Sequence, residues 1–144
     1  MTVLFSPLGL SYGTLYSAIL LVRPQRVVVV TSAQAENLLH SAVDAARFYH
    51  ASFSVETHVL PDPFAGFSQG RELARELATL AGDDNVVNLT GGTTVLQDCA
   101  RSIADILRGT NQCVREVAIV DERDGGEQTR NPLFLGRLVE VPPL

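Results

Sequence analysis

The sequence predicts an α/β fold: a Rossmann-like, mainly parallel six-stranded sheet with helices on both faces and a C-terminal hairpin. Three observations support this class. Strand-like runs alternate with helix-like segments along the whole chain. The run at 26–31 holds four consecutive valines and a threonine, which is typical of a strand covered on both faces. The length of 144 residues with 46% hydrophobic residues fits one domain, 1–144, with a substantial core.

The first half of the chain is expected to form two strand–helix units followed by a third strand. Pro24 ends the first helix because proline has no amide hydrogen and clashes with the preceding turn. In the second helix, apolar residues recur every three or four positions. The expected elements are a strand at 3–5, a helix at 13–22, a strand at 26–31, a helix at 35–49 and a strand at 53–60.

The second half continues the alternation and closes with two strands. A turn-rich segment at 61–66 precedes a helix whose charged residues, such as Arg71 and Glu72, form its solvated side. A polar segment containing Gly125 and Gly126 joins the last two strands as a hairpin. The expected elements are a helix at 67–80, a strand at 86–89, a helix at 94–107, a strand at 115–121 and a strand at 135–141.

The charged residues exclude several kinds of function. All eleven basic residues are arginines, so mechanisms that need lysine, such as a Walker phosphate loop, a pyridoxal Schiff base or a Ser-Lys dyad, cannot operate. The formal net charge of −5 has the wrong sign for gripping duplex DNA. A double-stranded DNA partner is therefore disfavoured.

Metal, disulfide and membrane signals are weak. Cys99 and Cys113 have no ligand-like spacing, and the three histidines form no pair at metal spacing. We therefore expect no metal, no cofactor and a reducing, cytoplasmic environment. The most apolar stretch, 12–22, is about half the length needed to cross a bilayer. An anchor or effector outside this chain stays possible.

Two loops are candidates for a binding site. Ligands of doubly wound sheets bind outside the carboxyl ends of the strands, where the strand order reverses. Residues 6–12 follow the first strand and residues 88–94 follow the fourth. These strands are neighbours in the usual doubly wound order, so we expect the two loops to converge.

The second of these loops, NLTGGTT, has the composition of a phosphate cradle without a formal positive charge. Its two glycines let backbone approach a ligand, and the following helix offers free amides and a dipole that favours anions. The structural alternative is a tight turn with a threonine cap. The candidate residues are Asn88, Thr90, Gly91, Gly92, Thr93 and Thr94.

The first loop offers hydroxyls, a glycine and apolar side chains. Leu8 and Leu10 can pack against a base, and Tyr12 can stack or form a hydrogen bond. The structural alternative is an ordinary loop whose leucines cover the core. The candidate residues are Ser6, Pro7, Leu8, Gly9, Leu10, Ser11 and Tyr12.

These residues resemble the CRISPR-associated Rossmann-fold domain, the sensor known as CARF, over nearly the whole chain. The features are SPLGLSYGTLYSAI between strand and helix, NLTGGTT, which is similar to the family's Asp/Asn-x-Thr-Gly-Gly-Thr-Lys signature, and the closing VAIVDERDGGEQTRNPLFLGRLVEV. The resemblance implies a homodimer that binds a cyclic oligoadenylate, most commonly the tetra-adenylate ring, which type III CRISPR complexes make as an antiviral second messenger. It also implies a fused effector or membrane module outside this chain.

The resemblance assigns roles to the two loops. Residues 6–12 would contact adenine and ribose, while Asn88 and residues 90–94 would hold the ribose-phosphate edge. Thr31 and Ser32, at the end of the second strand, would extend the pocket. A ring with two-fold symmetry suits a dimer in which each subunit offers the same loops.

Thr94 stands where the family often has lysine, a residue implied to stabilise the scissile phosphate in members that cleave the ring. We therefore assign no catalytic residue and expect a sensor. The alternative is a stand-alone ring nuclease that uses an arginine of the partner or the helix N-terminus.

Two more remote alternatives are other nucleotide-binding domains. A dinucleotide-binding oxidoreductase would need G-x-G-x-x-G in the first loop and an acidic residue after the second strand, and the sequence has neither. A flavodoxin-like domain would carry its phosphate loop after the first strand, and the chain has no tryptophan to sandwich a flavin.

Overall fold

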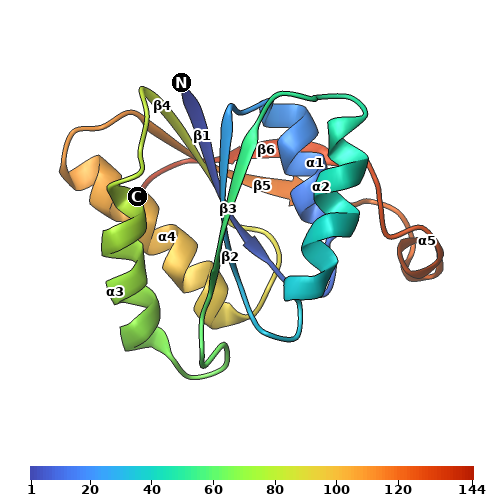
Figure 1. Ribbon diagram of the computed structural model, residues 1–144, viewed down its shortest axis with the longest axis horizontal. Helices are drawn as coiled ribbons and strands as arrows, with labels where there is room; N and C mark the ends of the chain where they lie inside the picture. The colour runs from blue at the N-terminus through green and yellow to red at the C-terminus, as the bar shows by residue number, and fades with distance from the viewer.

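The computed structural model describes residues 1–144 and is built on one six-stranded sheet in the order β3-β2-β1-β4-β5-β6 (Figure 1). The strands are β1 (Thr2–Leu8), β2 (Arg26–Thr31), β3 (Ser54–Val59), β4 (Asp84–Asn88), β5 (Val114–Val120) and β6 (Arg137–Val141). The first five strands run parallel, and β6 is antiparallel to β5. The predicted mainly parallel, Rossmann-like sheet is confirmed.

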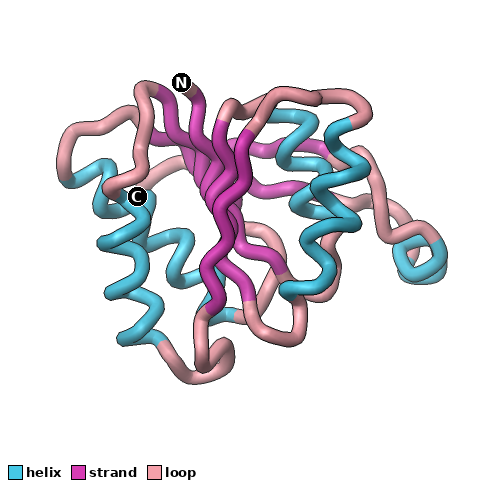
Figure 2. Tube along the Cα trace, viewed as in Figure 1, coloured by secondary structure: helices cyan, strands magenta, loops and turns pink.

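Helices cover both faces of the sheet. Helices α3 and α4 pack on one face, and α1 and α2 pack on the other (Figures 1 and 2). The helices are α1 (Gly13–Val22), α2 (Leu39–Arg47), α3 (Phe67–Ala78), α4 (Thr94–Gly109) and α5 (Gly125–Arg130), with a short 3-10 turn, η1 (Glu36–Leu38), before α2. None of these helices combines the length and the apolar character needed to span a membrane.

The side chains of β1 show why the sheet needs both helical layers. Val3 and Phe5 belong to the core under α3 and α4, whereas Leu4 and Leu8 belong to the core under α1 and α2. Successive side chains of a strand point to opposite faces, so the apolar run feeds both cores. The valines of β2 divide in the same way and are fully or almost fully buried.

β1 is longer than the sequence predicts. The strand was expected to end at Phe5, but it continues through Leu8. Beyond Phe5 it is paired with β2 alone, with Pro7 opposite Val30, since the register with β4 ends at Phe5 and Val87. A proline is tolerated where one side of a strand is unpaired. Ser6, Pro7 and Leu8 are therefore strand residues.

The C-terminal connection contains a helix that the sequence pattern did not predict. The expected antiparallel pair is present as β5 and β6, but α5 lies between them and projects from the sheet (Figure 1). The Asp124 side chain caps α5 by accepting a hydrogen bond from the backbone N–H of Glu127. This helix has six residues and no buried side chain, so it carries no apolar periodicity.

Candidate functional site

The loops after β1 and β4 meet at the carboxyl edge of the sheet, as the strand order predicts. A Cβ atom added to Gly9 would lie 2.5 Å from both the Cα and the amide nitrogen of Gly92. The two loops are therefore packed backbone against backbone. Only a residue without a side chain fits at Gly9, because both atoms that a Cβ would meet are main-chain atoms.

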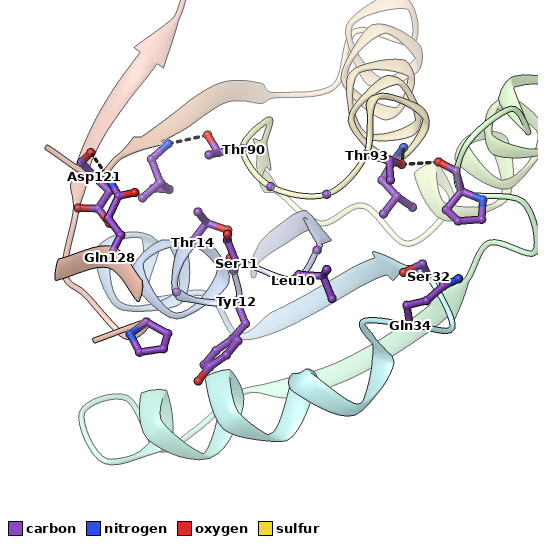
Figure 3. A pocket seen from close by; sticks show the side chains of 18 of the residues that line it. Leu10, Ser11, Tyr12, Thr14, Ser32, Gln34, Thr90, Thr93, Asp121 and Gln128 are labelled. Carbon is purple, nitrogen blue, oxygen red and sulfur yellow. Dashed lines mark hydrogen bonds between the residues drawn. The ribbon is translucent and has the colours of Figure 1, made fainter. Parts of the chain in front are cut away.

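A cavity of about 910 Å³ opens beside these loops (Figure 3). This volume lies in the range of small-molecule binding sites. From the two loops it is lined by Gly9, Leu10, Ser11, Tyr12, Gly13, Thr14, Thr90, Gly91, Gly92 and Thr93. From elsewhere it is lined by Ser32, Gln34, Pro63, Phe64, Leu96, Ile119, Asp121, Gln128, Thr129, Pro132 and Phe134.

The loop between β4 and α4 has a backbone that requires glycine. Gly91 has φ +103° and Gly92 has φ +76°, in the left-handed region that side chains disfavour. Thr93 then caps α4, its hydroxyl accepting from the Leu96 N–H at 3.3 Å and donating to the Pro63 carbonyl. The turn thus brings the N-terminal end of α4, which favours anions, to the cavity wall.

Some predicted site residues lie behind the cavity wall. Asn88 is fully buried; its Nδ2 donates to Ser6 Oγ at 3.0 Å and to the Thr90 carbonyl at 3.1 Å, and its Oδ1 accepts from the Thr90 N–H at 3.0 Å. Thr31 Oγ1 donates to the Leu8 carbonyl at 2.7 Å. These groups support the two loops from inside the protein.

The predicted residues thus divide into two groups. One group lies on the cavity wall and the other lies off it. Most residues of the group off the wall are turned into the interior by β1 and β2, and Thr94 is exposed on α4, so their direct contact with a ligand stays a prediction. Those on the cavity wall are Gly9, Leu10, Ser11, Tyr12, Ser32, Thr90, Gly91, Gly92 and Thr93. Those off the wall are Ser6, Pro7, Leu8, Thr31, Asn88 and Thr94.

The segment from Ile119 to Phe134 forms a wall of the cavity from which the sequence analysis assigned no site residue. The position of β5 could have indicated this wall. The loop after a parallel strand beside β4 opens at the same edge of the sheet as the loop after β4. Thr90 joins this wall to the glycine loop, because its Oγ1 accepts from the Ile119 N–H at 2.9 Å. Figure 3 shows Asp121 and Gln128 at the end of the cavity opposite Ser32 and Gln34.

Asp121 carries the only charged side chain on the cavity lining. The Arg123 guanidinium donates from Nε to Oδ1 at 2.9 Å and from Nη2 to Oδ2 at 3.0 Å. These hydrogen bonds hold the pKa of Asp121 below its usual range, although partial burial opposes them. Arg123 also lies 5.0 Å from the ring centre of Phe134. The carboxylate is thus ionised, paired and fixed in orientation.

Other reactive groups stand outside the cavity. Cys99 lies on the buried face of α4, and burial raises the pKa of its thiol to about 12, which suits a core residue. No cluster of three or more His, Cys, Asp or Glu side chains is placed to hold a metal ion. The cavity offers glycine amides, hydroxyls and exposed apolar side chains such as Leu10 and Phe64. This lining suits a ligand with both anionic and flat apolar parts.

Comparison with solved structures finds proteins of the same fold. Can2 from Sulfobacillus thermosulfidooxidans, solved in complex with cyclic tetra-adenylate, matches with a TM-score of 0.58 and 15% identity over 83% of this chain and 32% of its own. Protein VC1899 from Vibrio cholerae matches with a TM-score of 0.63 and 12% identity over 83% of this chain and 30% of its own. A type III CRISPR defence DNA nuclease activated by cyclic oligoadenylate matches with a TM-score of 0.59 and 24% identity over 81% of this chain and 18% of its own.

These similarities confirm the predicted CARF-like fold. The chain spans about a third or less of the length of the solved proteins that it matches. At these identities the likeness concerns the fold alone. Comparison of the sequence with protein families and with curated proteins finds no match.

Proposed function

We propose that residues 1–144 form a CARF-like sensor domain that binds cyclic oligoadenylate, with cyclic tetra-adenylate as the favoured ring, in type III CRISPR antiviral signalling. The observation that carries the proposal is the cavity beside the loops that pack together at Gly9 and Gly92. Two solved proteins with this fold bind, or are activated by, such a ring. The proposal therefore joins a built cavity to the ligand class of structural neighbours.

The chemistry of the cavity wall matches the parts of an oligoadenylate. We place a phosphate at Gly91 and Gly92, where backbone amides and the start of α4 favour anions. We place an adenine against Leu10 and Tyr12, which offer an apolar surface and an aromatic ring. In this arrangement Asn88 and Ser6 act indirectly, by holding the loops in place.

We propose that two copies of the domain share one ring. A ring of four identical nucleotides has two-fold symmetry, and a dimer with one repeated surface offers matching half-sites. The effector that reads the signal, a nuclease, toxin, transcriptional or membrane module, is proposed to lie outside residues 1–144. We place the domain itself in the cytoplasm.

The cavity wall favours sensing over cleavage. Cleavage of the ring builds negative charge on the scissile phosphate, which a nearby cation stabilises. No arginine lies on the cavity lining, and the nearby Arg123 is paired with Asp121. Thr94, at the family's lysine position, lies off the lining and is exposed. We therefore propose a domain that holds the ring, with slow cleavage as the alternative.

The test is thermal unfolding of the protein with cyclic tetra-adenylate, cyclic hexa-adenylate and linear tetra-adenylate as a control. At a ring concentration about a hundredfold above Kd, the folded state gains about 2.7 kcal/mol. The melting temperature should therefore rise by about 5 to 10 °C. Chromatography of the same mixtures should recover an intact ring after hours at equimolar protein. Absence of a shift with both rings would contradict the sensor proposal.

A glycine variant links the binding to the proposed site. Gly91→Val places a branched side chain on a left-handed backbone beside Thr14, so it should abolish the shift. Gly125→Val is the matched control, because a Cβ added at Gly125 meets nothing within 4 Å. Circular dichroism of both variants separates loss of binding from loss of folding. Normal binding by Gly91→Val would place the site elsewhere.

A further inference from the structure

Resting on the proposed function, we propose that Asp121 determines specificity by accepting one hydrogen bond from the ligand, donated by an adenine amine or a ribose 2′-hydroxyl. Asp121 follows β5 and lines the cavity, and its side chain keeps 16% of its surface exposed. Sequence reasoning did not assign it to the site. It is the one carboxylate that a bound molecule would meet on this wall.

The hydrogen bonds of Asp121 leave room for one more. An ionised carboxylate has about four acceptor positions, two on each oxygen. Oδ1 accepts from Arg123 Nε at 2.9 Å and from the Arg123 backbone N–H at 3.1 Å, while Oδ2 accepts from Nη2 at 3.0 Å. The remaining position is on Oδ2. The planar guanidinium fixes both oxygens, so the direction of this last acceptor is set before a ligand arrives.

The free acceptor selects among the parts of an oligoadenylate. A phosphate offers only acceptors and negative charge, so Asp121 repels it from this wall, and the glycine loop is the part of the lining that favours anions. The base-pairing edge of adenine has one donor, its amine, and a ribose hydroxyl also supplies one. The corresponding edge of guanine has two adjacent donors, of which a single acceptor satisfies only one. The wall therefore favours the hydrogen-bond donors of a nucleoside over the phosphates of the ring, and it sets the orientation of that nucleoside.

The experiment compares three rings by calorimetry: cyclic tetra-adenylate, the same ring with purine bases that lack the 6-amine, and the same ring with 2′-deoxyribose. The wild type should bind one of the two altered rings at least about tenfold more weakly, since a hydrogen bond to a charged group is lost. Loss with the first altered ring assigns the amine as donor. Loss with the second assigns the hydroxyl.

Variants connect this preference to the carboxylate. Asp121→Asn keeps the size of the side chain but turns an amide N–H₂ or a weaker acceptor to the ligand, so the preference should fall to within about twofold. Glu122→Gln is the matched control: it removes the same charge from the next residue, which bonds Arg137 at 2.8 Å and lies off the cavity lining. It should keep the wild-type preference.

The outcomes separate this inference from the proposed function. Equal binding of all three rings by the wild type would overturn the role of Asp121 while leaving cyclic oligoadenylate as the ligand, and this result needs no variant. A preference that persists in Asp121→Asn would also overturn it. If the wild type binds none of the rings, the proposed function fails and this inference fails with it.

Discussion

The two walls of the cavity are built in different ways. The loop wall, residues 9–14 and 90–93, is held by main-chain packing and by hydrogen bonds of the buried Asn88 side chain. The C-terminal wall, residues 119–134, is anchored at its ends by Ile119, which is buried, and by Phe134, whose carbonyl accepts from the buried Ser17 hydroxyl. Between these ends, α5 is held by ion pairs and side-chain hydrogen bonds at the surface. We therefore expect substitutions in the loop wall to cost more stability than substitutions at the exposed side chains of α5. Ligand selectivity is therefore expected to reside mainly in the second wall.

The burial of polar groups shows the same contrast. In the loop wall, the turn at Thr90 is bonded by Asn88, which is fully buried. In the C-terminal wall, none of the residues of α5 is buried, and Arg130 pairs with Glu127 at 3.3 Å in solvent. Exposed ion pairs contribute little to stability, while a buried polar group that loses its partner costs much more.

The largest expected effect on stability comes from one methyl group at Gly9. In Gly9→Ala the new Cβ would lie 2.5 Å from the Cα and amide nitrogen of Gly92, so the two loops must move apart. We expect the free energy of unfolding to fall by about 2 to 3 kcal/mol. Because the displaced loops line the cavity, we expect ring binding to be lost as well. The melting temperature should fall by about 10 °C.

The same substitution in the other wall is the control. A Cβ added at Gly125 meets nothing within 4 Å. Gly125→Ala should therefore change the free energy of unfolding by less than about 1 kcal/mol. Urea denaturation of both variants measures the contrast. Equal losses in the two variants would show that the close approach of the loops is unimportant.

The second largest effect on the free energy of unfolding is expected at Asn88, with Asn131 in the other wall as its control. Asn88→Ala leaves the backbone N–H and carbonyl of Thr90 without their partner, so we expect a loss of about 2 kcal/mol. Asn131→Ala removes one exposed hydrogen bond to Glu127 and should cost less than about 0.5 kcal/mol. Denaturant titration compares the two directly. A small effect at Asn88 would mean that the turn at Thr90 keeps its shape without the amide.

The loop wall was largely predictable from the sequence. Alternating strands and helices place the loops after β1 and β4 side by side, and glycines there indicate close backbone approach. The full length of β1 was not predictable, because proline usually interrupts a strand. Pro7 is accommodated only because β1 pairs with β2 alone beyond Phe5. For that reason the sequence assigned Ser6 and Leu8 to a loop, although they lie in a strand.

The C-terminal wall was not predictable by the same means. Its helix α5 has no apolar face, and hydrophobic periodicity detects only helices that pack against a core. In the sequence, Asp121 and Glu122 are adjacent acidic residues before the polar segment around Gly125, and nothing distinguishes one from the other. The structure instead turns Asp121 to the cavity through its pair with Arg123, whereas Glu122 pairs with Arg137 outside it. Which of two adjacent carboxylates faces a cavity depends on tertiary contacts.

Removal of Arg123 is expected to affect stability less than the substitutions at Gly9 and Asn88, and to alter binding instead. In Arg123→Gln, the melting temperature should fall by less than about 3 °C at pH 7. Ring binding should weaken more, because Arg123 fixes the orientation of the Asp121 carboxylate and balances its charge. Arg130→Gln removes the same charge from an arginine that pairs only with Glu127, so it should leave binding unchanged.

The dependence on pH identifies the Asp121–Arg123 pair as the source of this small stability difference. Arg123 holds the pKa of Asp121 below its usual range, so the pair stabilises the fold above the ordinary carboxyl pKa of about 3.9. As pH falls through the lowered pKa, Asp121 takes up a proton and that contribution is lost. The difference in melting temperature between wild type and Arg123→Gln should therefore shrink from pH 7 to pH 3. A difference that stays constant over this range would assign the stabilisation to the contact between Arg123 and the Phe134 ring instead.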